Sequence, residues 1–580
     1  MILNDQQRDA VTQDGHTCLV ACPGSGKTRT IIAKILRCVS EVSGSTRRIA
    51  CITYTNTAVD EIESRLREYG SGSDLDYCEV GTIHSFCLNN ILRPHYHRLP
   101  ELAEGFKVLP PDSPEWRELV DRLARVHNID RRRLDYFSGV QRDPDGSLFH
   151  PDAIPRNAAA DFVKYMDENA QVTFADIVYH SCSLIRAHEF IGRGLASRFA
   201  WMLIDEFQDT SKAQVLILNA LARFHRTTFF VVGDPNQSIM GFAGARPELM
   251  RQFATSMHSE IGIVLSGNYR CSQLVVDDAE RLIATKPRMT AVGPTKSCPL
   301  RTMLVNAASC ADCVFDHFLP TLDSAGIRLG DAAILAPWWS TLYPLAKALR
   351  EKGVPVIGPG SRPYHRAREF SDFSEHLSAY AEEKGTDLFR RVQRSLFIML
   401  LNITGDACWD VYSYAGRRCL YMMLAEIQGL AKQCRTAVAW LVKAADAVTR
   451  ALVAEGFMPP SLKHVLPESA EQMIADMQRN KVDMANLTTG DLGVYARPKE
   501  CLHLMSMHAS KGREFDAVAI VNLHDGVVPD FRAKTQSDID EDRRQLYVAM
   551  TRPRKLLMYC TDSSDWRNRP SPFLQVIGVV

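Results

Sequence analysis

The chain has 580 residues, of which 46% are hydrophobic and 23% are charged, a composition typical of a globular protein with several domains. Lys plus Arg and Asp plus Glu both number 68, so the net charge is zero. This balance excludes binding to polyanions through overall positive charge and confines any basic surface to a local one. The start lacks a leader pattern, and no run approaches 18 apolar residues, so we expect a cytoplasmic protein without a membrane span.

The 16 cysteines are scattered along the chain, which favours reduced intracellular thiols over a disulfide framework. Cys310 and Cys313 form the one C-x-x-C pair, with Cys298 upstream. A metal or iron–sulfur site needs a fourth ligand and tighter grouping. We therefore interpret the pair as buried or free thiols, and its role stays open.

The first predicted element is a helix over residues 3–11 that begins at Asn4 or Asp5 as its cap. The side-chain amide of Gln7 offers a donor and an acceptor in one plane, which matches the hydrogen-bonding edge of adenine. We expect Gln7 to select adenine. A surface glutamine of an ordinary helix is the alternative.

Residues 19–28 change from an apolar run to a glycine-bearing loop that ends in Gly-Lys-Thr. This order predicts a strand, a phosphate-binding loop and the first turn of a helix. Gly24 and Gly26 allow backbone conformations that direct N–H groups at phosphate oxygens. Lys27 would contact the β- and γ-phosphates, and Thr28 would hold Mg²⁺. The expected nucleotide-binding residues of this loop are Gly24, Ser25, Gly26, Lys27, Thr28 and Arg29.

Polar and aromatic side chains follow the next two predicted strands. Tyr54, Thr55 and Asn56 stand where the strand over residues 48–54 ends, and His84 stands at the end of a strand that includes Val80. Loops at the carboxyl edge of a parallel sheet suit contacts to sugar and phosphate. Ordinary turn chemistry is the alternative for each residue.

Helices and proline-rich loops from about residue 87 to 175 predict an insertion, after which an apolar strand at 201–204 leads to Asp205 and Glu206. An aspartate at the end of a buried strand beside a phosphate loop suits a Mg²⁺ ligand. The glutamate after it suits the base that orients or activates water. Helix capping is the alternative for both carboxylates.

A further apolar strand over residues 229–232 is followed by Gln237 and Phe242. The amide of Gln237 is placed to sense the γ-phosphate. The ring of Phe242 is suited to stack on an unpaired base.

The ordered set of motifs resembles that of superfamily-one helicases of the UvrD/Rep/PcrA type. The resemblance rests on the Gln7 stretch, the phosphate loop and residues 53–56, 82–86, 205–209 and 233–239. It implies an α/β fold of two RecA-like parallel-sheet motor domains, each with a mainly helical insertion. The implied boundaries are 1–86 and 176–265 for the first motor domain, 87–175 for its insertion, 266–365 and 495–580 for the second motor domain, and 366–494 for its insertion.

The second half of the chain continues the resemblance. Residues 268–270 look like the motif that supplies a first arginine finger, Arg270, from the second motor domain. Residues 504–515 are similar to the motif that couples DNA to nucleotide, which implies His508 near the strand and Glu514 at the ribose. Residues 541–552 look like the last motif, with Arg552 as the second finger.

A guanidinium suits the finger role on physical grounds, because it presents a permanent, planar charge to the negative charge that spreads over the γ-phosphoryl oxygens. A structural ion pair is the alternative for both arginines.

Ala21 stands where the common phosphate-loop pattern has glycine. Two positions depart from the family pattern, since Ala243 replaces an arginine and Arg513 replaces an aliphatic residue. Because Ala243 carries no charge beside Phe242, we expect the stacking of a DNA base on Phe242 to depend on the bound nucleotide in a different way from that in the family. The insertions also look shorter than in stand-alone helicases, which favours weak autonomous unwinding or dependence on a partner.

The resemblance implies a translocase or helicase that uses ATP and Mg²⁺ to move 3′ to 5′ on single-stranded DNA or a tailed duplex, in DNA repair or anti-phage defence. The alternative is a nucleic-acid-sensing ATPase subunit that regulates a separate nuclease and unwinds little. This second hypothesis follows from a resemblance to the helicase subunit of Gabija anti-phage systems, whose partner is an OLD-type nuclease. Only 28 residues follow Arg552, so we expect any cleavage to come from another protein. An RNA helicase is a third interpretation.

Overall fold

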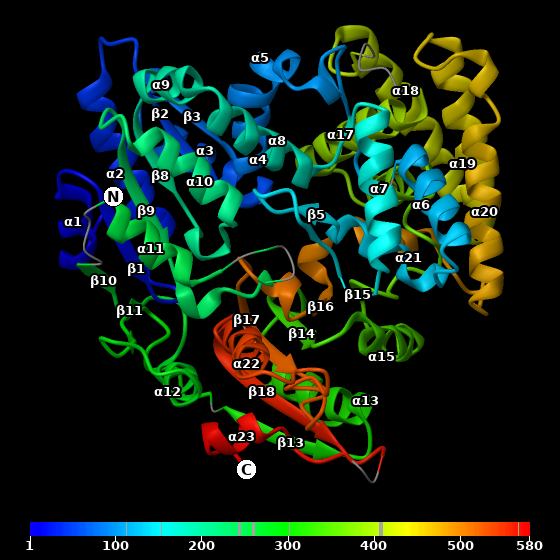
Figure 1. Ribbon diagram of the computed structural model, residues 1–580. Coiled ribbons are helices and arrows are strands. Elements are labelled where there is room, and N and C mark those ends of the chain that lie inside the picture. Colours follow the sequence, from blue (N-terminus) through cyan, green and yellow to red (C-terminus); the bar gives the residue numbers. More distant parts are fainter. Residues whose placement is uncertain are drawn as a thin grey trace. The chain divides into compact units, whose positions relative to one another are not determined.

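The computed structural model describes the chain apart from residues 112, 152, 242, 243, 245, 258–261, 301, 405–409, 566 and 567. The chain divides into two compact units, Met1–Pro299 with Arg532–Thr551, and Leu300–Phe531 with Arg552–Val580. Each unit contains a six-stranded parallel sheet (Figure 1). The expected α/β fold with two RecA-like parallel-sheet domains is therefore confirmed.

The two units divide the chain differently from the predicted domains. Residues 266–299 and 532–551, which we expected in the second motor domain, belong to the first unit. The reason is that helix α22 (Gln536–Met550) packs on the short helix η7 (Pro235–Gln237) and on α12 (Gln273–Leu282). The four-part division otherwise stays a prediction.

Helices cover both faces of the first sheet. Its strand order is β10 (Ile263–Leu265), β1 (Thr17–Ala21), β9 (Thr228–Gly233), β8 (Phe199–Ile204), β2 (Arg48–Thr53) and β3 (Cys78–Thr82). Alternate residues of a strand point to opposite faces. Leu203 therefore joins the core under α1 (Asp5–Thr12), α2 (Lys27–Val42) and α3 (Asn56–Tyr69), whereas Met202 joins the core under α8 (Phe174–Ala187), α9 (Glu189–Arg198) and α10 (Lys212–Ala222).

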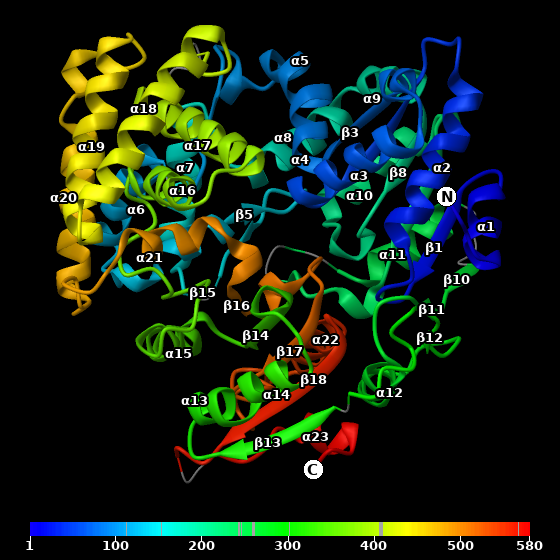
Figure 2. The same cartoon turned by 180° about the vertical axis from the view of Figure 1, so that it is seen from behind.

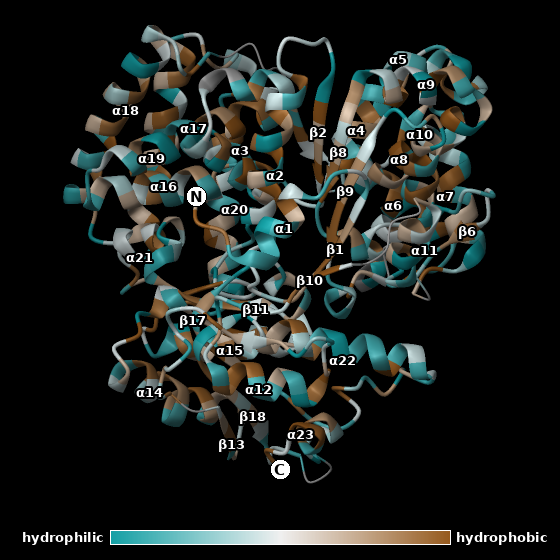
Figure 3. Ribbon diagram, turned by 90° about the vertical axis from the view of Figure 1, so that its left-hand side faces the viewer, coloured by the Kyte–Doolittle hydropathy of each residue, from teal (hydrophilic) through white to brown (hydrophobic). Residues whose placement is uncertain are grey.

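Because side chains on both faces of the sheet are buried, most residues in its central strands are apolar. Figures 1 and 2 show the two faces of the sheet, and β1 and β9 are brown in Figure 3. Because all six strands are parallel, the loops that follow β1, β2, β3, β8 and β9 meet at one carboxyl edge. This edge collects most of the residues predicted for the functional site.

The first insertion is built around its own aromatic core. Trp116 on α6 (Pro114–Val126) meets Phe162 on α7 (Arg156–Glu168) edge to face, and Phe137 of η5 (Arg131–Gly139) packs on the same ring. Two short pairs of strands accompany these helices: β4 (Lys107–Val108) with β7 (Gln171–Val172), and β5 (Gln141–Arg142) with β6 (Leu148–Phe149). Smaller helices of the first unit are α4 (Ile83–Cys87), α5 (Arg93–His95) and α11 (Glu248–Ser256), and β11 (Gly267–Asn268) pairs with β12 (Thr290–Ala291).

The second sheet has the order β13 (Met303–Ala307), β18 (Pro553–Asp562), β17 (Phe515–Ile520), β14 (Ala332–Ala336), β16 (Leu502–Ser506) and β15 (Val356–Ile357). Its helices are α13 (Cys310–Asp312), α14 (Leu319–Ser324), α15 (Trp339–Glu351) and α23 (Pro572–Ile577). Cys313 is buried here beside Cys560. The described residues contain no group of three or more metal-ligating side chains.

The second insertion is a helical domain around the fully buried Trp440. Its helices are α16 (Ser371–Glu382), α17 (Thr386–Thr404), α18 (Tyr414–Gln433), α19 (Ala437–Ala454), α20 (Val465–Arg479) and α21 (Thr489–Gly493). No helix in the described ranges is long and apolar enough to cross a bilayer.

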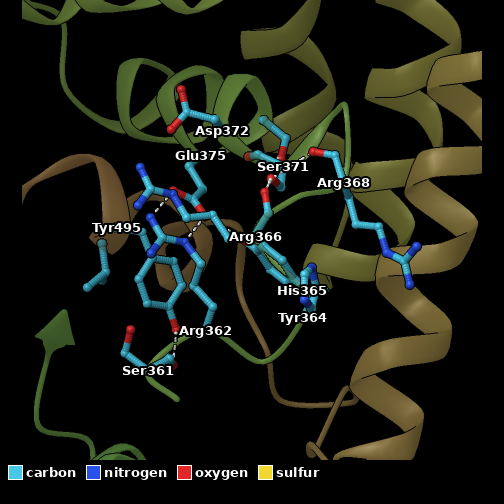
Figure 4. Close-up of polar contacts among 12 residues, drawn as sticks. Ser361, Arg362, Tyr364, His365, Arg366, Arg368, Ser371, Asp372, Glu375 and Tyr495 are labelled. Carbon is cyan, nitrogen blue, oxygen red and sulfur yellow. Dashed lines mark hydrogen bonds and ion pairs between the residues drawn. The ribbon is translucent and has the colours of Figure 1, made fainter. Parts of the chain in front are cut away.

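A buried ion pair connects the two chain segments that join this insertion to the second sheet (Figure 4). Arg362, before α16, donates from Nε and Nη2 to the two carboxylate oxygens of Glu375 on α16, at 2.6 and 2.8 Å. The hydroxyl of Tyr364 donates to the same carboxylate at 3.0 Å. Tyr495, after α21, places its ring 5.0 Å from the guanidinium and donates its hydroxyl to the carbonyl of Ser361 at 2.9 Å. Both connections are therefore held in one polar cluster.

We expect Arg362→Met to lower the stability of the second unit by about 3 kcal/mol, because it leaves the buried Glu375 carboxylate without its counter-charge. The control is Arg450→Met, which breaks an exposed ion pair with Glu426 in the same insertion and should cost less than about 0.5 kcal/mol. Differential scanning calorimetry of the full chain measures both. Equal shifts in the two variants would contradict the importance of the buried pair.

Candidate active site

The predicted phosphate loop lies between β1 and α2, and its two glycines adopt left-handed backbone conformations. The φ angles are +65° at Gly24 and +82° at Gly26, which L-residues with a Cβ rarely adopt. A Cβ on Gly24 would lie 2.7 Å from the Cβ of Arg270. The loop is also fixed by backbone bonds, since Cys22 N donates to the Leu265 carbonyl at 3.0 Å and Tyr269 N to the Gly24 carbonyl at 2.8 Å. The conformation thus requires both glycines.

Gln7 lies against this loop and is buried. Its Nε2 donates to the Ser25 carbonyl at 2.9 Å, and its Oε1 accepts from Asn4 N at 3.1 Å as part of a capping box of α1. Both ends of the amide therefore contact backbone groups. Contact with adenine stays a prediction and would require at least one of these bonds to be exchanged. Arg29 is exposed at the start of α2, with Nη1 3.5 Å from the Ile2 carbonyl.

The two predicted catalytic carboxylates follow β8 and lie near Lys27. Asp205 is buried, and its N–H continues the sheet by donating to the Ile52 carbonyl at 2.9 Å. Glu206 has a φ of +51° and donates its N–H to Asp205 Oδ1 at 2.9 Å. Its Oε1 is 3.8 Å from Nζ of Lys27. The left-handed turn at Glu206, unusual for a residue with a side chain, directs the second carboxylate toward the phosphate loop.

Negative charge is concentrated at this position. Burial and the neighbouring Glu206 raise the pKa of Asp205 to about 7, and burial raises the pKa of Asp234, which follows β9. Lys27 opposes both shifts. A divalent cation near Asp205 and Thr28 would favour the ionised carboxylate. In the described part of the chain, the buried hydroxyl of Ser25 has no hydrogen-bond partner. The side chains of Ser25, Lys27, Thr28 and Asp205 therefore fit a nucleoside triphosphate bound together with Mg²⁺.

Gln208 is a site residue that sequence reasoning missed. Its amide is fully buried, donates to Glu206 Oε2 at 2.5 Å and accepts from Asp234 N at 2.9 Å. Asp234 in turn accepts from Nε2 of Gln237 at 2.6 Å. One hydrogen-bonded chain thus joins the expected catalytic base to the expected γ-phosphate sensor. The signal was present, because Gln208 belongs to the motif that was interpreted only for its carboxylates.

Arg270 lies beside the phosphate loop and belongs to the first unit; that it acts as a finger from the second motor domain stays a prediction. Its N–H donates to Asn268 Oδ1 at 2.8 Å, and its Nη1 donates to the Thr551 carbonyl at 3.0 Å. Asn268 is fully buried and also accepts from Cys271 N at 2.7 Å. An asparagine that accepts from backbone N–H groups two and three residues later forms a common turn, so its positioning role was readable in the Asn-Tyr-Arg motif.

The remaining predicted nucleotide residues belong to the second unit. Arg552 directly precedes β18, and its Nη1 is 3.5 Å from the Arg513 carbonyl. Glu514 directly precedes β17 and pairs with Arg554 at 3.1 Å. His508 instead follows β16. Since these strands are parallel, Glu514 and Arg552 share the amino-terminal edge of the sheet, and His508 lies at the carboxyl edge. Their roles stay predictions.

Four of the residues predicted for DNA contact lie at the carboxyl edge of the first sheet. Thr55 caps α3 by accepting from Ala58 N at 3.2 Å, and Asn56 is the exposed first residue of that helix. Tyr54 lines a pocket of about 20 Å³ together with Asp205 and Glu206, and burial raises its pKa to about 12. His84, on α4, meets Phe174 edge to face at 5.9 Å, and burial lowers its pKa. Burial also lowers the pKa of His508 in the second unit. Phe242 lies outside the described residues.

We expect Asp205→Asn to raise the melting temperature of the metal-free protein at pH 8. An unfolded aspartate ionises near pH 4, whereas Asp205 in the native state ionises at about pH 7. The native state therefore holds the extra proton between these values, and stability falls as the pH rises through this window. The gain in Asp205→Asn should be about 1–3 kcal/mol at pH 8 and smaller at pH 5.5.

The measurement is thermal unfolding at both pH values in EDTA. Asp9→Asn, which changes an exposed carboxylate of α1, is the control and should shift neither value. If Asp205→Asn instead lowered the stability at pH 8, burial of the ionised carboxylate would not destabilise the native state, and the prediction would be wrong.

Family models and individual relatives both match UvrD-like DNA helicases. Residues 3–258 match the family model of the UvrD/REP helicase N-terminal domain, and residues 464–564 match that of the UvrD-like helicase C-terminal domain. DNA helicase II of Haemophilus influenzae is 26% identical over 99% of this chain and 86% of its own length. ATP-dependent DNA helicase PcrA of Staphylococcus epidermidis is 24% identical over 99% and 86%, and DNA helicase II of Escherichia coli is 24% identical over 99% and 87%. The two family matches together cover more than half of the chain.

Proposed function

Because the chain belongs to the UvrD-like family of superfamily-one DNA helicases, we propose that this DNA-dependent ATPase moves 3′ to 5′ along single-stranded DNA. Its substrates are single strands and tailed duplexes, and its cofactors are ATP and Mg²⁺. The observation that carries the ATP-hydrolysis part of the proposal is the position of Lys27 Nζ, 3.8 Å from Glu206 Oε1 at the carboxyl edge of the first sheet, whereas the direction of movement rests on the resemblance to the family. We propose that the protein acts in DNA repair or in anti-phage defence.

Each residue of the site has a distinct task in hydrolysis. The phosphate loop and Lys27 would bind the phosphates, and Thr28 with Asp205 would hold the metal. When bound, Mg²⁺ and ATP supply the electrophilic γ-phosphoryl group and the charge that stabilises its transfer. Glu206 orients the attacking water and takes its proton, and the amide of Gln208 holds that carboxylate in place.

Gln237 and Arg270 act on the γ-phosphate side. Gln237 is held through Asp234, whose own N–H is bound by Gln208. A change at the γ-phosphate position would therefore reach Glu206 and Gln237 through the same short chain of hydrogen bonds. Arg270 is held beside Gly24 by Asn268, and its guanidinium is suited to developing negative charge.

We expect Lys27→Ala and Glu206→Gln to lose ATP hydrolysis for different reasons. Lys27→Ala removes a phosphate contact, so both ATP affinity and turnover should fall, with turnover reduced by at least about 100-fold. Glu206→Gln keeps the size of the side chain but removes the base, so ATP should still bind while turnover falls by a similar factor. Equilibrium binding of ATP and steady-state turnover separate the two effects.

Lys212→Ala, on the exposed first turn of α10, is the matched control and should retain both properties. Substantial DNA-stimulated turnover in Lys27→Ala would remove the basis for the nucleotide site.

Strand displacement tests polarity. The purified chain with ATP and Mg²⁺ should separate a duplex that carries a 3′ single-stranded tail and leave one with a 5′ tail intact. Separation from the 5′ tail alone would reverse the proposed direction. Failure on both, with ATP turnover still stimulated by single-stranded DNA, would favour the nucleic-acid-sensing subunit that regulates a separate OLD-type nuclease. Equal stimulation by RNA would revive the RNA helicase.

A further inference from the structure

Helix α22 contacts the segment that directly follows the expected γ-phosphate sensor. Arg544 donates from Nε to the Ser238 carbonyl at 2.7 Å, and Glu541 accepts from Gly241 N at 3.2 Å. The two side chains are one turn apart on α22, so they hold both ends of the four-residue segment 238–241. Gln237 stands immediately before this segment, and the residue expected to stack on DNA, Phe242, stands immediately after it.

The same helix reaches the other γ-phosphate residue at its carboxyl end. The carbonyl of Thr551, which directly follows α22, accepts from Arg270 Nη1 at 3.0 Å. Within the last turns of α22, Tyr547 is fully buried, and its electrostatic neighbours include Asp234, the partner of Gln237. Helix α22 and the residue that follows it therefore contact both the segment after Gln237 and the side chain of Arg270.

The absence of a side chain at residue 241 is what allows the acidic contact. A Cβ on Gly241 would lie 2.6–2.9 Å from the carboxylate atoms of Glu541, closer than nonbonded atoms approach. The backbone of Gly241 is not in the left-handed region, so alanine is tolerated by the chain itself. Gly241→Ala would therefore displace the carboxylate without deleting it.

Both contacts join an ionised side chain to the backbone, and such bonds are stronger than those between neutral groups. Burial lowers the pKa of Arg544, and the acidic neighbours Glu541, Asp540 and Glu248 oppose this shift. A segment held by two such bonds moves with the helix that holds it. It does not adjust independently when one neighbour changes.

We propose that Glu541 and Arg544 are positioning residues that fix segment 238–241 and so couple the γ-phosphate side of the active site to the DNA contact expected at residue 242. They act through the segment and touch neither nucleotide nor DNA. The inference rests on the proposed function, because it presupposes that single-stranded DNA stimulates ATP turnover. It adds the residues that carry this stimulation.

The test measures ATP turnover of the full chain with and without a poly(dT) oligonucleotide. Glu541→Met and Arg544→Met each remove one charged bond, and each should reduce the stimulation ratio about tenfold. The loss should appear in the DNA-stimulated kcat and not in KM for ATP. The conservative variants Glu541→Gln and Arg544→Lys keep an acceptor and a donor, and each should restore at least about half of the stimulation.

A double-mutant cycle tests the contact itself. Gly241→Ala should reproduce the loss seen in Glu541→Met, and the combination Gly241→Ala with Glu541→Met should lose no more than either alone. Ser537→Ala, at an exposed position on the first turn of the same helix, is the control and should keep full stimulation. Unchanged melting temperatures keep a folding defect separate from loss of coupling.

The outcomes separate the inference from the proposed function. If the natural sequence shows DNA-stimulated turnover and folded Glu541→Met and Arg544→Met keep it, the positioning role is overturned and the proposed function stands. Additive losses in the double variant would overturn the contact between residues 241 and 541. If the natural sequence shows no stimulation by DNA, the proposed function fails and the inference fails with it.

Discussion

The concentration of carboxylates at one edge of the first sheet is the constraint on which the site depends. Asp205, Glu206 and Asp234 lie in or beside a buried region, and burial raises the pKa of both aspartates. Charge of one sign in such a place is costly unless cations compensate it. Lys27 opposes this cost and is 3.8 Å from Glu206. A divalent cation beside these carboxylates would compensate more of this charge than Lys27 does alone.

The parallel sheet makes this concentration possible. Five strand ends deliver their loops to the same edge, and the backbone of the sheet continues into the site, since Asp205 N still donates to Ile52. A carboxylate placed in this way has little conformational freedom. The hydrogen-bonded chain from Glu206 through Gln208 and Asp234 extends the same rigidity sideways from β8 to β9. The loops after these two neighbouring strands thus hold Glu206, the expected base, and Gln237, the expected sensor, in a fixed relation to each other.

The sequence predicts the parts of this site whose chemistry is local. Glycines in a loop before a helix and carboxylates directly after an apolar strand are local patterns, so the conformation of the phosphate loop and the position of Asp205 and Glu206 could be predicted. Gln208 and Asn268 stand in motifs that the sequence shows, but one partner of Gln208 is 26 residues away. Asn268 accepts from backbone N–H groups two and three residues later, which is a local signal that the sequence analysis did not use. The assignment of residues 266–299 and 532–551 to the first unit depends on packing between distant segments, and apolar periodicity does not report it.

Residues 532–551 belong to the first unit although the chain before and after them belongs to the second, and this places α22 beside the residues expected to contact the γ-phosphate. Helix α22 packs on η7, which carries Gln237, and on α12, so it belongs to the same unit as the phosphate loop. Through Arg544 and Glu541 it holds the segment between Gln237 and residue 242, and the carbonyl after its last turn holds Arg270. The covalent chain then enters the second unit at Arg552, the expected second finger. A displacement of α22 would therefore act on segment 238–241 through the middle of the helix, and on Arg270 and the chain at Arg552 through its carboxyl end.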